Sequence, residues 1–214
     1  MAPLYLIRPI SGECVARVSI TSNVHQFLST KIRQGDNVID ATLGNGHDAL
    51  FLTELIGNEG QLFGFDIQPE AIDSTLKKLA SHQLDHRATL IMKSHAYMAK
   101  FIPAQFHGRI KCIVFNLGYL PGSDKSTTTL PESTLPALDI ALNLLSERGI
   151  ISILAYSGHP GGEEECDAVK LWVNRLPEEH YETSVINLLP DHNSPPEWIL
   201  ITKVKTLPKS DSEN

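Results

Sequence analysis

Acidic and glycine residues follow two apolar runs early in the chain, at spacings that suit nucleotide binding. The run Val38-Ile39-Asp40 is followed by the turn Gly44-Asn45-Gly46, and a second run ends at Asp66, about 20 positions after the glycines. Glycine has no Cβ and tolerates positive φ, so the backbone can approach a ligand at such a turn. An acid at this distance can accept hydrogen bonds from ribose hydroxyls. Residues 37–68 therefore predict a strand, glycine turn, helix and strand that bind a nucleotide; glycines needed only for packing are the alternative.

A second group of chemical interest, Asn116-Leu117-Gly118-Tyr119, follows the apolar run from Ile110 to Phe115. It resembles the Asn-Pro-Pro-Tyr motif of methyltransferases that modify amino groups, although both prolines are missing. In that motif the Asn side chain and a backbone carbonyl accept hydrogen bonds from the amine, and the aromatic ring packs against its carrier. Methyl transfer requires an amine lone pair held about 3–3.5 Å from the methyl carbon. An aliphatic amine, with a pKa near ~10.4, is protonated in neutral water, so such a site must favour the neutral form.

The elements that position these residues alternate between strands and helices. Helices are expected from Thr21 or Ser22 to about Ile32, through Leu50–Leu55, from Gln68 to Ala80, from Ser133 or Thr134 to Leu145, and from Glu163 to Leu176. Strands are expected at 38–41, 62–65, 89–92, 110–115, 149–156, 181–188 and 198–204. This order predicts an α/β fold of Rossmann type: a central, mostly parallel seven-stranded sheet with an antiparallel last strand and helices on both faces. One domain is predicted at 21–204, between an N-terminal arm (1–20) and a disordered tail (205–214).

Composition limits the classes of function. The 214 residues are 42% hydrophobic, which suits one buried core, and the net charge of −7 argues against broad, nonspecific nucleic-acid binding. The three cysteines are isolated, which favours a reduced protein without a disulfide framework or a metal site. Neither a membrane-length apolar run nor a leader is recognised, so a cytoplasmic protein without membrane contact is expected; a processed organellar domain is the alternative.

The spacing Asp40-x-x-x-Gly44-x-Gly46 resembles the first motif of class I S-adenosylmethionine-dependent methyltransferases. Further segments are similar to the family once labelled putative rRNA methylase: Asp40–Asp48, Gly64–Gln68, Lys93–His95, Phe115–Gly122, Tyr156–Pro160 and Asn193–Pro196. Members of that family are understood as tRNA 5-aminomethyl-2-thiouridine methyltransferases. The resemblance implies S-adenosylmethionine as cofactor, the anticodon region of tRNA as partner, and methylation of the aminomethyl nitrogen of the wobble uridine. A homodimer is a further hypothesis.

The resemblance also implies roles for individual residues. The implied cofactor-binding residues are Asp40, Thr42, Gly44, Asn45, Gly46, Asp48, Asp66, Ile67, Gln68, Ser94, His95 and Asn116. The implied catalytic residues are Asn116, Tyr119 and His159, where Asn116 and the Leu117 carbonyl orient the amine and His159 either relays a proton or only shapes its loop. The implied substrate-binding residues are Leu117, Tyr119, Gly122, Asp124, Lys125 and Tyr156.

Other functions remain open at this point. A methyltransferase of the same fold could act on rRNA or on a small-molecule amine, which the negative charge favours. The pattern Gly44-x-Gly46-x-x-Ala49 also matches a loose dinucleotide motif of dehydrogenases, although the position of Asp40 and the segment 116–121 argue against it. A non-catalytic cofactor-binding protein is the third alternative. A tRNA substrate would require a local basic face, for which Arg8, Arg17, Lys31, Arg33, Lys125 and Arg175 are candidates, or a face built across a dimer.

Overall fold

A computed structural model describes residues 20–120, 127–187 and 196–204. Seven strands form one sheet in the order β3-β2-β1-β4-β5-β7-β6. The strands are β1 (Asn37–Asp40), β2 (Gln61–Asp66), β3 (Ala88–Met92), β4 (Ile110–Leu117), β5 (Leu145–Ala155), β6 (Tyr181–Asn187) and β7 (Glu197–Lys203). The first five run parallel, while β7 is antiparallel to both β5 and β6. The predicted fold, with its antiparallel last strand, is confirmed.

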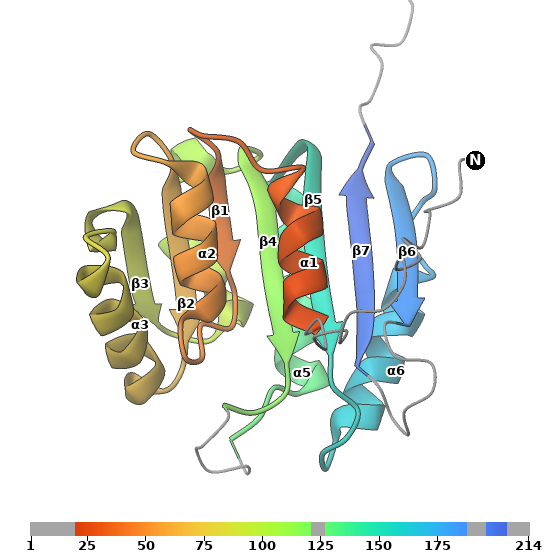
Figure 1. The fold of residues 1–214 in the computed structure, drawn as a ribbon. Helices are drawn as coiled ribbons and strands as arrows, with labels where there is room; N and C mark the ends of the chain where they lie inside the picture. Colours follow the sequence, from red (N-terminus) through yellow and green to blue (C-terminus); the bar gives the residue numbers. More distant parts are fainter. Residues whose placement is uncertain (1–19, 121–126, 188–195, 205–214) are drawn as a thin grey trace, which may run out of the picture.

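Helices cover both faces of the sheet, as Figure 1 shows. Helices α1 (Ile20–Ser29), α2 (His47–Ile56) and α3 (Pro69–Ser81) lie on the near face, and α5 (Pro131–Leu144) and α6 (Gly162–Val173) lie on the far face. Each face has its own hydrophobic cluster, because the central strands are apolar on both sides. Short helical segments that the sequence did not predict lie before and after β3. Segment η1 (Asp85–Arg87) connects α3 to β3, and the connection from β3 to β4 contains η2 (His95–Tyr97), α4 (Met98–Phe101) and η3 (Ala104–Phe106).

The strand order determines where the ligand crevice forms. The chain moves outward from β1 to β2 and β3, then returns to add β4 on the other side of β1. In an open parallel sheet the loops at this reversal diverge and leave a crevice at the carboxyl ends of the strands. The loops after β1 and β4 carry the two groups of residues singled out in the sequence. The fold therefore brings both groups to one edge of the sheet.

Several element boundaries differ from the sequence prediction. Strand β4 continues through Asn116 and Leu117, because both pair with β5 at Leu154 and Ala155. Helix α1 ends at Ser29, although Ile32 beyond it is still buried. On α3 the buried positions are Ala71, Thr75 and Leu79, whereas Leu76 and Ala80 are exposed.

Some predicted features lie outside the described residues. These are the N-terminal arm, the segment with Gly122, Asp124 and Lys125, the segment Asn193–Pro195 and the tail from 205. In the described ranges no helix has both the length and the apolar character needed to cross a membrane. Cys112 and Cys166 are free and buried.

Candidate active site

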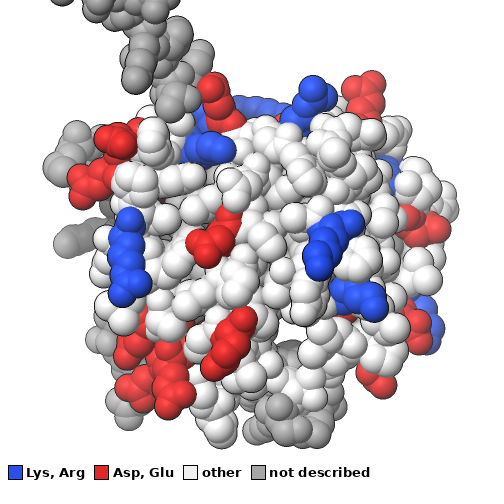
Figure 2. Space-filling view, turned by 180° about the vertical axis from the view of Figure 1, so that it is seen from behind, with Lys and Arg blue, Asp and Glu red and all other residues white. Residues whose placement is uncertain are grey.

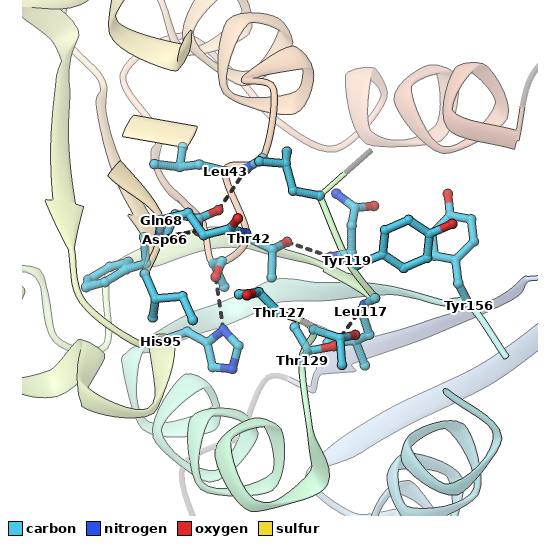
Figure 3. Close-up of a pocket in the computed structure, with 18 of the residues that line it drawn as sticks. Thr42, Leu43, Asp66, Gln68, His95, Leu117, Tyr119, Thr127, Thr129 and Tyr156 are labelled. Carbon is cyan, nitrogen blue, oxygen red and sulfur yellow. Dashed lines mark hydrogen bonds between the residues drawn. The ribbon is translucent and has the colours of Figure 1, made fainter. Parts of the chain in front are cut away.

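A cleft of about 680 Å³ lies at the carboxyl edge of the sheet, between the loops after β1, β2, β3, β4 and β5 (Figure 3). Most of the predicted site residues line it. They are Thr42, Gly44, Asn45, Asp48, Asp66, Ile67, Gln68, Ser94, His95, Asn116, Leu117, Tyr119, Tyr156 and His159. The volume lies in the range of small-molecule and cofactor sites. The sheet therefore assembles one site from residues that are spread over more than half the chain.

Asp66 joins the glycine turn to the loop after β2. Its Oδ2 accepts the backbone N–H of Gly44 at 3.0 Å, and its Oδ1 accepts the backbone N–H of Gln68 at 3.0 Å. A carboxylate oxygen has two lone pairs, so each oxygen of Asp66 retains one acceptor position. Ile67 next to it is 55% exposed and lines the cleft, which leaves an apolar surface free for a ring. This arrangement fits an adenosine: the diol of the ribose on Asp66 and the base against Ile67.

Two residues of the predicted cofactor set lie below the cleft instead of lining it. Asp40 is fully buried, and its Oδ1 accepts the backbone N–H of Thr42 at 3.1 Å. Burial and the nearby Asp48 raise the pKa of Asp40 well above its ordinary value. Gly46 has a φ of +72°, and a Cβ at this position would lie 2.8 Å from Cα of Thr75. In the structure Asp40 therefore supports the turn, and the missing side chain of Gly46 allows α2 to pack closely on α3.

His95 contributes a buried neutral acceptor. It is only 7% exposed, and its Nδ1 lies 3.1 Å from the carbonyl oxygen of Ala41. Burial lowers its pKa, so the ring is neutral, Nδ1 donates to Ala41 and Nε2 carries a lone pair. Among the described residues this Nε2 has no hydrogen-bond partner. A buried acceptor in the lining of a cleft indicates a donor on the ligand, as the ammonium or a hydroxyl of a cofactor would supply.

Asn116, at the end of β4, is fixed by two neighbours from the glycine-turn segment. Its backbone N–H donates to Thr42 Oγ1 at 2.7 Å, and its Nδ2 donates to Asp48 Oδ2 at 2.5 Å. A carboxylate only accepts hydrogen bonds, so the amide of Asn116 must present its nitrogen to Asp48 and its oxygen elsewhere. Asn116 lines the cleft and is partly exposed. Its carbonyl oxygen is thereby available to a ligand.

Aromatic residues occupy the end of the cleft away from Asp66 and Gln68 (Figure 3). The ring of Tyr119 meets the ring of His159 edge to face, with centroids 5.6 Å apart. Tyr156 is 38% exposed, and its backbone N–H donates to the Leu117 carbonyl at 3.3 Å. That carbonyl therefore takes part in the sheet and has one lone pair left for an amine. His159 Nδ1 lies 3.1 Å from the carbonyl oxygen of Pro160.

A buried acid that the sequence prediction missed supports this aromatic end. Glu165 on α6 is 1% exposed and accepts hydrogen bonds from Thr129 and Thr134, each at 2.6 Å. Thr129 in turn accepts the backbone N–H of Gly118 at 2.8 Å and returns its own N–H to the Gly118 carbonyl at 3.0 Å. In the sequence Glu165 ends a run of three glutamates at a helix start, which indicates a solvated helix end. No local pattern distinguishes it from its neighbours.

Three of the cations expected to form a basic face lie in the described residues, and these three do not gather at the cleft. Lys31 and Arg33 precede β1 and Arg175 precedes β6, so all three lie at the amino edge of these strands, opposite the site. Lys93 lines the cleft. On the face shown in Figure 2, the Lys and Arg of the described residues are mixed with Asp and Glu and do not form a continuous basic patch. Arg8, Arg17 and Lys125 lie outside the described residues.

Comparison with known proteins bears on the family. The family model described as "Putative rRNA methylase" matches residues 62–202. A curated relative from Arabidopsis thaliana, "tRNA (mnm(5)s(2)U34)-methyltransferase, chloroplastic", is 37% identical over 174 residues, which are 78% of this chain and 63% of the relative. The chain thus spans less than two thirds of that relative.

Solved structures agree with this family. A "putative rRNA-methylase" from Clostridium thermocellum is 38% identical with a TM-score of 0.82, over 86% of this chain and 97% of that chain. A "putative methyltransferase" from Streptococcus mutans, solved in complex with SAH, is 32% identical with a TM-score of 0.76, also over 86% and 97%. The family resemblance predicted from the motifs is confirmed. The chain belongs to the "Putative rRNA methylase" family, within the class I S-adenosylmethionine-dependent methyltransferases.

Proposed function

We propose that this protein transfers a methyl group from S-adenosylmethionine to the aminomethyl nitrogen of 5-aminomethyl-2-thiouridine at the wobble position of tRNA. The observation that carries the proposal is the amide of Asn116, which Asp48 holds by its nitrogen so that the oxygen is left for an amine. The relative from Arabidopsis thaliana is named for the methylaminomethyl form of the same nucleoside. The site geometry and the relative's name thus favour the same acceptor.

The two ends of the cleft suit the two reactants. Bound S-adenosylmethionine supplies an electrophilic methyl group, and Asp66, Ile67 and His95 would hold it from the β2 and β3 side. Asn116 and the remaining lone pair of the Leu117 carbonyl orient the amine, while Tyr119 and Tyr156 flank its uracil ring. These rings exclude water from the nitrogen, which favours the neutral, nucleophilic amine. Gly122, Asp124 and Lys125 remain predicted substrate contacts.

The proposal also covers the wider setting. Cytoplasmic location is supported by the isolated cysteines, which suit a reducing compartment. Contact with the anticodon region would use Lys93, Lys125 and the arm, or a face formed across a homodimer. The domain division at residues 20 and 205 is part of the same proposal.

A methyl-transfer assay on bulk tRNA from cells that lack the gene tests the function. Nucleoside mass spectrometry should show 5-aminomethyl-2-thiouridine converted into its methylaminomethyl form, only when enzyme and S-adenosylmethionine are both present. Bulk tRNA from cells that keep the gene serves as control, since its acceptor is already methylated. Binding of cofactor without any transfer to tRNA would reject the tRNA substrate.

A small-molecule amine is the second candidate. It is favoured by the net charge of −7 and by the position of Lys31, Arg33 and Arg175 away from the cleft. The two candidates differ in salt dependence, because tRNA binding through phosphates weakens steeply as salt rises. If methylation of tRNA is insensitive to salt between ~50 and ~200 mM, phosphate contacts contribute little and the small amine gains support.

A further inference from the structure

Asp48, in the first turn of α2, joins two side chains from different parts of the chain. Its Oδ2 accepts the Asn116 amide, and its Oδ1 lies 2.5 Å from Nε2 of His25 on α1. The side chains of His25 and Asp48 are 23% and 15% exposed. Hydrogen bonds in which one partner is charged are shorter and stronger than those between neutral groups. A continuous hydrogen-bonded path therefore runs from the amine-orienting residue to a partly exposed imidazole.

The imidazole is held in place by packing. The His25 ring stacks on the Phe51 ring with centroids 3.8 Å apart and an interplanar angle of 4°. Phe51 follows Asp48 by three positions on α2, so the two side chains share one face of the helix. Helix α1 thus presents His25 to Asp48 at the back of the cleft. The sequence prediction assigned Asp48 to the cofactor and gave His25 no role.

The proposed reaction must release one proton per turnover. The substrate arrives as an ammonium, R–CH₂–NH₃⁺, and must lose a proton to gain a lone pair. The nitrogen then forms a bond to the methyl carbon as the bond from that carbon to sulfur breaks, and the product is R–CH₂–NH₂⁺–CH₃. The sulfonium loses its positive charge when it becomes a thioether, and the released proton accounts for that charge. A group in the site that accepts this proton would make the reaction independent of free hydroxide.

We propose that Asp48 accepts the proton of the substrate ammonium and that His25, protonated in this ion pair and bound to Asp48 through its Nε2–H, releases its Nδ1 proton to solvent, so that the charge of the pair is unchanged. This inference rests on the proposed function and names the proton acceptor for it. Asp48 lines the cleft beside Asn116, and one lone pair remains on each of its oxygens after the contacts with Asn116 and His25. His25, which is partly exposed, can exchange a proton with water.

Other ionisable groups surround the pair. Asp40 on β1, Cys112 on β4 and Tyr156 after β5 all interact with Asp48, and Asp66 adds negative charge near Asp40. The pKa of Tyr156 is raised, first by burial and then by Asp48. His25 is the ion-pair partner that the described residues supply to Asp48.

His159 is the competing acceptor in the same cleft. Its Nδ1 is engaged with Pro160 and its ring packs against Tyr119, and no hydrogen bond links it to Asn116. His47 also lines the cleft, but its ring nitrogens contact Nζ of Lys78 at 3.0 and 3.2 Å. The geometry thus separates His25 from His159 and His47 by its link to Asn116 through Asp48.

The pH dependence of turnover tests the proposal. In the wild type, proton transfer inside the site should make kcat vary little between about pH 6.5 and about pH 9. In Asp48→Asn the proton must leave to solvent, so kcat should fall by roughly 100-fold at neutral pH and recover about tenfold per pH unit. His25→Phe keeps the stack on Phe51 and should show the same trend with a smaller loss. Asp73→Asn and His86→Phe, both exposed and away from the cleft, serve as matched controls.

The outcomes separate the possible roles. A loss in Asp48→Asn that stays constant with pH would overturn the proton role and leave a positioning role. The same pH-dependent recovery in His159→Phe, with none in His25→Phe, would assign the proton to His159. Inactive wild-type enzyme with intact cofactor binding would reject the proposed function instead.

A spectroscopic measurement keeps the test independent of activity. The hydrogen bond from His25 to Asp48 should give a low-field imidazole proton resonance in the wild type. That resonance should disappear in His25→Phe and in Asp48→Ala but persist in His86→Phe. A spectrum unchanged by Asp48→Ala would show that the pair does not form, and the proposal would fail even with an active enzyme.

Discussion

The two ends of the cleft are built in different ways. At the cofactor end, Asp66 binds the backbone N–H groups of Gly44 and Gln68, and all three residues lie within one strand-turn-helix-strand unit. At the acceptor end, side chains from distant segments hold one another: Asp48 holds Asn116, 68 residues away, and Glu165 holds Thr129, 36 residues away. The cofactor end therefore depends on local backbone geometry, and the acceptor end on long-range side-chain contacts.

This difference predicts how each end should respond to substitution. A change at the cofactor end should weaken cofactor binding, because the binding groups are part of the turn itself. A change at the acceptor end should leave the cofactor in place and alter turnover, substrate affinity or local stability. Substitutions at one end that impair both properties equally would break the comparison.

Asn116→Ala should have the largest effect. The amine loses its side-chain acceptor, and kcat should fall by about 10²–10³, or ~3–4 kcal/mol, as for loss of one oriented group in a preorganised site. The dissociation constant for S-adenosylmethionine, measured by calorimetry, should change by less than ~threefold. Equal losses in turnover and cofactor affinity would contradict an orienting role.

Asp66→Asn should produce the opposite pattern. The negative charge is lost and one carboxylate oxygen becomes an NH2 donor, so one backbone N–H and one ribose hydroxyl lose their acceptor. Hydrogen bonds to a charged group contribute about 1.5–3 kcal/mol each. Cofactor affinity should fall by roughly 100-fold, with kcat at saturating cofactor within about tenfold of the wild type. Calorimetry with SAH gives the affinity directly, and Asp73→Asn is the control.

Gly46→Ala should destabilise the fold more than it affects ligands. Its φ of +72° is unfavourable for alanine, and the added Cβ would meet the Thr75 backbone at 2.8 Å. A loss of about 1–3 kcal/mol in the free energy of unfolding is expected from such overpacking. Gly108→Ala, at a φ of +72° but with no heavy atom within 4 Å, isolates the cost of backbone strain from that of the contact. Similar losses in both variants would reject the packing role.

Glu165→Gln should have the smallest effect and change the pH dependence of stability. Burial raises the pKa of Glu165, so the folded state favours the neutral acid. For a raised pKa, this stabilisation is complete below the unfolded-state pKa, near ~4.3, and is lost as pH rises through the folded-state pKa. The free energy of unfolding of the wild type, relative to Glu165→Gln, should therefore fall as pH rises from ~4. Denaturant titrations across this range measure it, and a constant difference would contradict the assignment.

The sequence was sufficient to predict the fold and most of the cleft lining. The alternation of apolar runs with helical periods predicted all seven strands, and the family motifs placed Asp66, Asn116 and Tyr119 at the carboxyl edge. These features depend on local patterns, which one sequence displays directly. The functional assignments of individual residues remain predictions for the experiments above.

The remaining features depend on contacts that no local pattern contains. His25 has no motif around it, and only the packing of α1 on α2 brings it to Asp48. The extension of β4 through Leu117 follows from pairing with β5, which places the Leu117 carbonyl in the sheet. The glycine motif predicted that Gly46 binds the cofactor, whereas in the structure a Cβ at Gly46 would meet Thr75. Such long-range effects override local preference.

The most direct test of the central claim locates the transferred methyl group. Purified enzyme would be supplied with S-adenosylmethionine carrying a deuterated methyl group and with tRNA that bears, or lacks, the aminomethyl group at the wobble uridine. Fragmentation of the isolated nucleoside should place the label on the aminomethyl nitrogen, and tRNA without that group should remain unlabelled. Label on a ring carbon or a ribose, or no label while cofactor binding is intact, would contradict the account.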